Sequence, residues 1–107
     1  MILSPFVLAE LDYLLVTRVG RVAELALLGE IACGTYRLEP FSAEDVVRTR
    51  TVIERYAGFG DVGLVDASNV VLAERHGTRD ILTLDERHFR VLRGPGALPF
   101  RLLPANS

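Results

Sequence analysis

Helix-length segments alternate with short apolar runs along the whole chain, and this alternation constrains the fold more than any other feature. The expected helices cover residues 5–18, 21–33, 43–58 and 64–76, and the expected strands cover 36–41, 80–84 and 99–104. Strands separated by helices favour an α/β layer fold in which most of the sheet is parallel. No repeat, linker or low-complexity segment interrupts the pattern, and 107 residues predict a single domain.

Local signals mark the ends of several expected helices. Ser4 followed by Pro5 is typical of a helix start. Ser42, followed three residues later by Asp45, resembles a capping box. Gly77 follows the last expected helix and is typical of a helix end. The first helix is apolar on almost every side, which predicts that it is buried.

The composition argues against several classes of function. The net charge is only −2, so no global basic field indicates nucleic-acid binding, although all twelve cationic residues are arginine. One cysteine rules out an internal disulfide framework. No apolar run is long enough to span a membrane, and we interpret the apolar start, which lacks a basic leader, as structure rather than a signal peptide. A cytoplasmic location is therefore expected.

Acidic residues stand where a purely structural role is not obvious. Asp85 follows the apolar run 81–84, and ligands of open parallel sheets bind beyond the carboxyl ends of the strands. Asp66 lies in the first turn of the preceding helix. Asn69, one turn further, fits a hydrogen bond to a metal-bound water or, as we expect, a place on the ordinary helix surface. Glu10 lies in the apolar first helix, where burial without a partner or a metal is unfavourable. Oxygen ligands without a histidine or cysteine pair suit Mg²⁺ or Mn²⁺ rather than zinc.

Each acid also has a simpler structural interpretation. Asp85 and Asp61 both fit helix caps, because aspartate is a common capping residue. Asp66 suits the positive end of a helix. Glu10 fits a solvated position or an ion pair with Arg18. Taken singly, these residues do not distinguish a metal site from ordinary structure.

Three segments resemble consecutive signature segments of the PIN-domain family, specifically its VapC-like toxin ribonucleases. They are SPFVLAELDYLL at 4–15, GLVDASNVVLAERHG at 63–77 and ILTLDERHF at 81–89. Their order and spacing match over nearly the whole chain, whereas the middle helices match only in pattern. The most specific part is VDAxxxxLAE followed by TLDxRHF. The resemblance implies a three-layer α/β fold with a short, mostly parallel sheet flanked by helices.

The resemblance also implies a site and a reaction. Glu10, Asp66 and Asp85 would belong to an acidic cluster that holds one or two divalent ions, Mg²⁺ or Mn²⁺, with Asp61 as an auxiliary member. The activity implied is that of an endoribonuclease, the toxin of a type II toxin–antitoxin system, with RNA as substrate, a small antitoxin as partner and a homodimeric assembly. Three arginines that follow Asp85 closely in the sequence are candidate contacts to the RNA backbone, or else form a solvated face. They are Arg87, Arg90 and Arg93.

The chain departs from the family pattern at its N-terminus. Family members begin with a strand that carries the first catalytic aspartate, whereas this sequence starts where the family's second strand ends. We therefore expect the sheet to close by dimer exchange, by rearranged pairing or with another polypeptide, because a missing central strand exposes the edges of its neighbours. Metal affinity and rate are expected to fall. The alternative function is an inactive PIN-like remnant that only dimerises or binds an antitoxin.

Overall fold

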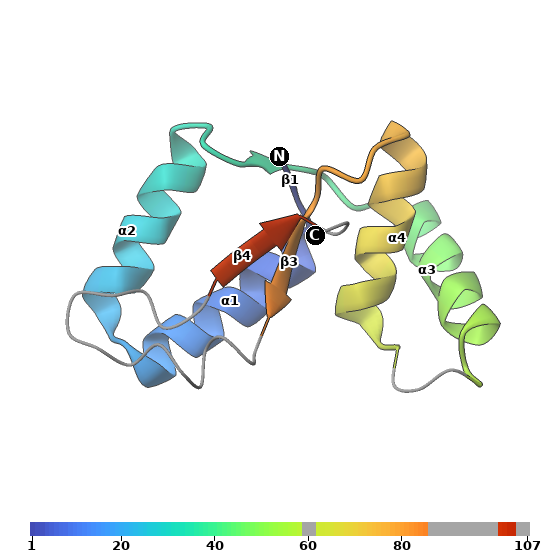
Figure 1. Ribbon diagram of the computed structural model, residues 1–107, viewed down its shortest axis with the longest axis horizontal. Helices are drawn as coiled ribbons and strands as arrows, with labels where there is room; N and C mark the ends of the chain where they lie inside the picture. The colour runs from blue at the N-terminus through green and yellow to red at the C-terminus, as the bar shows by residue number, and fades with distance from the viewer. Residues whose placement is uncertain (59–61, 86–100, 105–107) are drawn as a thin grey trace.

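Helices and short strands alternate along the chain, as the sequence predicts (Figure 1). The computed structural model describes residues 1–58, 62–85 and 101–104, with only the backbone described at 84–85 and 101–104. The elements are β1 (Ile2–Leu3), α1 (Pro5–Arg18), α2 (Arg21–Ala32), β2 (Arg37–Leu38), α3 (Ala43–Arg55), α4 (Leu64–His76), β3 (Leu82–Asp85) and β4 (Arg101–Pro104). In the part of the chain that is described, no helix is long and apolar enough to cross a membrane.

The expected end signals define the helix boundaries. Ser4 caps α1, and its hydroxyl accepts a hydrogen bond from the backbone N–H of Phe6 at 3.1 Å. Ser42 and Asp45 form the predicted capping box at the start of α3. Gly77 follows α4 with a φ of 60°, the left-handed conformation that commonly ends a helix. These three predictions are confirmed.

Three expectations about the helices and strands need correction. The strand expected at 36–41 contains only Arg37–Leu38, and Pro40 lacks the N–H that further pairing would need. The helix expected to reach residue 58 ends at Arg55, because Tyr56 leaves the helical conformation with φ of −101° and ψ of 11°. Helix α1 is not buried on every side, since Tyr13 is 66% exposed.

The strand β1 has a pairing partner on each side. It pairs in parallel with β2, and Ile2 forms a parallel bridge with Ile81 just before β3. The backbone N–H of Ile2 donates to the carbonyl of Asp80 at 2.9 Å. The other pair, β3 with β4, is antiparallel. The described strands thus form two two-stranded pairs, and the bridge between Ile2 and Ile81 joins them.

Neighbouring residues of the strands face opposite helical layers. Ile2 and Ile81 pack on the side of α4, whereas Leu3 and Leu82 pack with Val7 of α1 on the other side. Such alternation is the rule in a strand, where successive side chains point to opposite faces. The strands therefore lie between the α1–α2 hairpin and the α3–α4 hairpin, as Figure 1 shows. The predicted three-layer α/β fold with a short parallel sheet is confirmed.

Candidate acidic site

The acids suggested by the sequence lie on three different elements. Glu10 is exposed on α1, and Asp66 is exposed in the first turn of α4. Asp85 is the last residue of β3, where only the backbone is described. Outside the described residues lie the auxiliary acid and the three candidate RNA contacts: Asp61, Arg87, Arg90 and Arg93.

The three elements that carry these acids pack against one another. Leu3, Val7 and Leu82 form a buried cluster, and Val65 of α4 packs against it. We call these four side chains the junction cluster. The three buried members are at most 1% exposed, so the contact between α1 and β3 excludes water. Burial of apolar surface therefore fixes how α1, α4 and β3 lie relative to one another.

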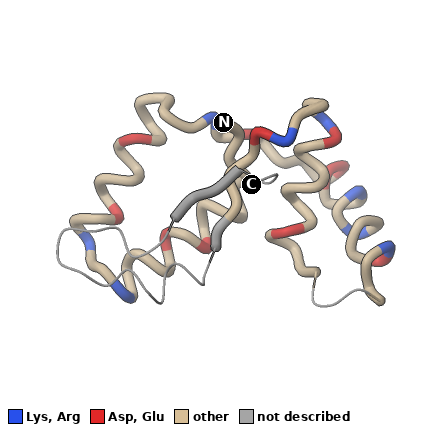
Figure 2. Tube along the Cα trace, in the orientation of Figure 1, with Lys and Arg blue, Asp and Glu red and all other residues tan. Residues whose placement is uncertain are grey.

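Each acid lies within three residues of a side chain of the junction cluster. Glu10 follows the α1 member by about one helical turn. Asp66 directly follows Val65 of α4. Asp85 lies roughly 10 Å along β3 from Leu82. Strand β3 ends on the side where α4 begins (Figure 1), and Figure 2 shows acidic positions on α1 and near that end of α4. The arrangement supports convergence of the carboxylates, which stays a prediction because the Asp85 side chain is not described.

The two described carboxylates are free to bind a ligand. Neither Glu10 nor Asp66 makes a hydrogen bond or ion pair through its side chain within residues 1–58 and 62–83. The pairing of Glu10 with Arg18 that the sequence allowed is therefore not formed. Among the described side chains, no group of three acidic, histidine or cysteine residues lies close enough to share a metal. The expected set includes Asp85 and Asp61, whose side chains fall outside that description.

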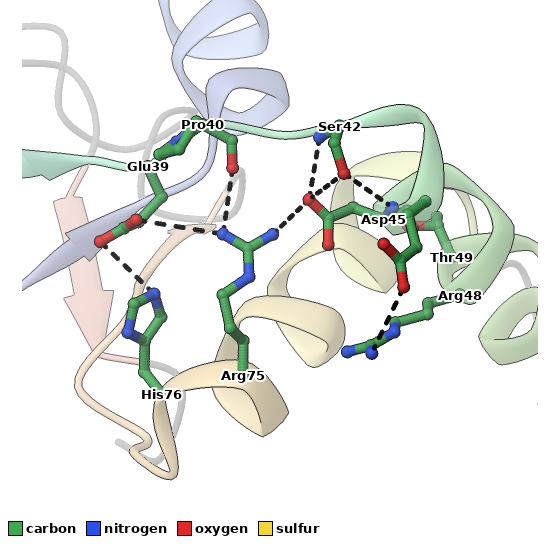
Figure 3. Close-up of polar contacts among 9 residues, drawn as sticks. Glu39, Pro40, Ser42, Asp45, Arg48, Thr49, Arg75 and His76 are labelled. Carbon is green, nitrogen blue, oxygen red and sulfur yellow. Dashed lines mark hydrogen bonds and ion pairs between the residues drawn. The ribbon is translucent and has the colours of Figure 1, made fainter.

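A second charged group joins the far end of α4 to β2 and α3 (Figure 3). Arg75 forms an ion pair with Asp45 at the start of α3. The Glu39 carboxylate, with 7% of its side chain exposed, contacts Arg37 Nε at 2.7 Å and lies 3.4 Å from His76 Nε2. We call these five residues the Arg75 network. Each of its acids has a cationic partner, whereas Glu10 and Asp66 have none among the described side chains.

The Arg75 network has a structural role. The backbone N–H of Ser42 and the guanidinium of Arg75 hold the pKa of Asp45 below its ordinary value. Arg75 lies nine residues beyond Asp66, which is about 13 Å along the axis of α4. The sequence predicted the cap made by Asp45 and the place of His76 at the end of its helix. The contact between Arg75 and Asp45 is not predictable from local sequence patterns, because these residues are some thirty positions apart.

Asn69 is the clearest correction to the sequence reasoning about α4. It was expected on the helix surface, but it is 7% exposed, and its Nδ2 donates to the backbone carbonyl of Leu82 at 3.1 Å. Its Oδ1 is buried without a hydrogen-bond partner among the described residues. Helical spacing contained the signal, since Asn69 is three residues before the buried Leu72 and therefore shares its face.

A three-layer α/β domain with a short parallel sheet, and with free carboxylates on elements that meet at one cluster, has the architecture of a PIN domain. No family model matches the chain. Ribonuclease VapC26 of Mycobacterium tuberculosis (strain ATCC 25618 / H37Rv) is 46% identical over 104 residues, which cover 97% of this chain and 76% of that protein. The chain belongs to the VapC-like family of PIN-domain toxin ribonucleases.

Proposed function

We propose that this chain is a divalent-metal-dependent endoribonuclease and the toxin of a type II toxin–antitoxin pair. The observation that carries the proposal is the 46% identity to a named ribonuclease over 97% of the chain. The exposed carboxylates of Glu10 and Asp66 support it, because neither is engaged by another described residue and both are available to a cation. RNA is the proposed substrate.

The donor set of the proposed site fits Mg²⁺ or Mn²⁺. Carboxylate oxygens are hard ligands, and Mg²⁺ in proteins is held by few carboxylates together with water and substrate phosphates. Glu10, Asp66 and Asp85 are the proposed ligands, with Asp61 as an auxiliary one. A bound ion would offset the charge of the phosphodiester and stabilise the leaving oxygen. The protein contributes by holding the carboxylates in place.

Arginines that follow β3 in the sequence are the proposed contacts to the RNA backbone. A guanidinium presents a planar fork of donors that matches a phosphate, so it orients the strand without reading its sequence. The proposed residues are Arg87, Arg90 and Arg93. Their contribution would be to place the scissile phosphate against the acidic site.

Cleavage of RNA by the purified chain tests the proposed function. Wild type is assayed with Mg²⁺ and with EDTA, and Asp66→Asn is compared with Glu74→Gln at the exposed far end of the same helix. Wild type and Glu74→Gln should cleave with Mg²⁺ and not with EDTA. Asp66→Asn should be slower by roughly 100-fold or more, because losing a ligand exceeds the 10–100-fold typical of outer-sphere changes.

The other outcomes separate the competing explanations. Equal cleavage by all samples, with EDTA included, would indicate a contaminating nuclease and remove the support for the proposal. No cleavage by any sample would favour the alternative of a non-catalytic module that dimerises or binds an antitoxin. Cleavage that depends on Mg²⁺ but is unchanged in Asp66→Asn would show that the proposed ligands are wrong.

A small antitoxin protein and a second copy of the chain are the proposed protein partners. The α1–α2 hairpin supports a protein contact, because it exposes several large apolar side chains and burial of apolar surface favours association. Those exposed there are Tyr13, Val16, Val19, Val22, Leu25 and Leu28. Light scattering should give a dimer for the chain alone and a larger complex with the product of a neighbouring short open reading frame. A monomer in both samples would contradict both partners.

A further inference from the structure

Three consecutive residues attach the start of α4 to three different parts of the fold. They follow Asp66 directly and are Ala67, Ser68 and Asn69. All three are buried, whereas Asp66 itself is exposed. The three buried residues therefore fix the helical turn that carries the Asp66 carboxylate, and each of them contacts a different element.

Ala67 and Ser68 connect this turn to the two helical layers. Ala67 is 0% exposed and packs in a cluster with Val52 of α3. The Ser68 hydroxyl lies 2.7 Å from the hydroxyl of Ser4, the cap of α1, and also donates to the carbonyl of Val65 at 2.7 Å. Both serines are 0% exposed. This buried hydroxyl pair joins the helix that carries Asp66 to the first residue before the helix that carries Glu10.

Asn69 connects the same turn to the strand that ends at Asp85. Its Nδ2 donates to the Leu82 carbonyl, and Leu82 is three residues before Asp85. In a strand the backbone between these two residues is extended, so fixing one end of β3 also restricts the other. Ser68 and Asn69 thus bond the two elements that carry the other proposed ligands.

Stability alone is a poor explanation for the amide at position 69. Its Oδ1 is buried without a partner in the described part of the chain. A buried acceptor left unpaired is unfavourable, and such groups in native structures call for an explanation. A leucine would fill similar volume and remove this unpaired acceptor, but it would also remove the donor to the Leu82 carbonyl. Residues that break a rule of stability are concentrated at functional sites.

We propose that Ser68 and Asn69 are positioning residues that fix Asp66 relative to Glu10 and Asp85 and so set the affinity of the site for a divalent ion. The proposal rests on the proposed function, since it assumes that these acids share the ion. Mg²⁺ demands near-ideal ligand geometry, and ligands held within about half an ångström of their place bind it best. A loose first turn of α4 would spread the Asp66 carboxylate over many positions and weaken binding.

Binding of Mn²⁺ and unfolding in urea, measured on the same proteins, test the proposal. The variants are Asn69→Leu, which keeps the volume and removes the amide, and Ser68→Ala, which removes the hydroxyl pair. Val71→Ala is the matched control, because Val71 is 2% exposed on the same helix but packs against Val52 of α3. Calorimetric titration of the full chain with Mn²⁺ gives the affinity without any dependence on activity.

The expected result is that affinity and stability change separately. Asn69→Leu should bind Mn²⁺ about tenfold more weakly, the lower end of the effect of outer-sphere changes. Its urea midpoint should fall by less than that of Val71→Ala, because removal of the unpaired Oδ1 offsets the lost hydrogen bond to Leu82. Ser68→Ala should also bind more weakly. Val71→Ala should lower the urea midpoint and leave the affinity of the folded protein unchanged.

Three results would overturn the positioning role. Wild-type affinity in both Asn69→Leu and Ser68→Ala refutes it while leaving the metal site intact. Weaker binding in all three variants in proportion to their lost stability shows a general effect of destabilisation. Absence of Mn²⁺ binding in wild type refutes the metal site of the proposed function, and the positioning role with it.

Discussion

Leu72 gives the most direct test of how α4 is held against the strands. Its side chain is 0% exposed and packs with Ile2 and Ile81, at the bridge that joins β1 to the start of β3. Leu72→Ala removes three carbon groups, worth about 0.8 kcal/mol each in transfer free energy. Incomplete collapse of the remaining cavity adds to this, so we expect a loss of about 3 kcal/mol. That is a large part of the roughly 5–15 kcal/mol expected for a domain of this size.

Urea denaturation followed by circular dichroism measures the loss. Leu25→Ala is the matched control, since Leu25 is 59% exposed on α2 and the same substitution there should change stability by less than about 0.5 kcal/mol. The slope of the unfolding free energy against urea should stay the same in both variants. Equal losses for the two leucines, or a loss below about 1 kcal/mol for Leu72→Ala, would refute the packing of α4 on the strands.

Three further predictions concern local features of the fold. Gly77→Ala should destabilise by about 1 kcal/mol, because φ is 60° there, whereas Gly29→Ala inside α2 should stabilise by up to about 1 kcal/mol. Neither added Cβ meets a neighbouring side chain or segment within 4 Å, so the difference reflects the backbone conformation, and thermal melts of the two variants measure it. Ser42→Ala should cost about 1 kcal/mol through loss of the capping box, with an unchanged melting temperature as the contrary result. A hydrogen bond with Asp12 and burial raise the pKa of Glu24 above its ordinary 4.5, so the stability it contributes is present below pH 4.5 and is lost as pH rises through the raised pKa. Glu24→Gln should therefore gain on wild type between pH 4.5 and 7, and parallel pH profiles of the two proteins would contradict this.

The fold was predictable wherever the relevant signals were local. The start of α1 and the end of α4 agree with the sequence, because a serine cap with proline and a final glycine act on their own helix. The extent of β2 was only partly predictable, since Pro40 is a local limit but a strand also ends where its partner ends, and β1 contains only Ile2–Leu3. Strand length therefore depends on residues more than thirty positions away.

The elements that carry the candidate acids Glu10 and Asp66 were predictable from the sequence, whereas their role in a shared site stays a prediction. Glu10 and Asp66 stand on α1 and α4 as expected, and both are exposed and free of partners in the described part of the chain. Residue type does not predict the burial of Asn69, because asparagine is usually exposed, whereas the spacing to its buried neighbours does indicate it. The bond from Asn69 to Leu82 joins two elements, and only the tertiary structure reveals such a contact.

Glu10, Asp66 and Asp85 share one divalent ion in the function that we propose. Anomalous diffraction from a crystal of this chain grown with Mn²⁺ measures it directly. We expect one strong peak within roughly 2.5 Å of a carboxylate oxygen from each of the three residues. A peak bound elsewhere, such as at Glu39, or three carboxylates too far apart to reach one ion, would contradict it.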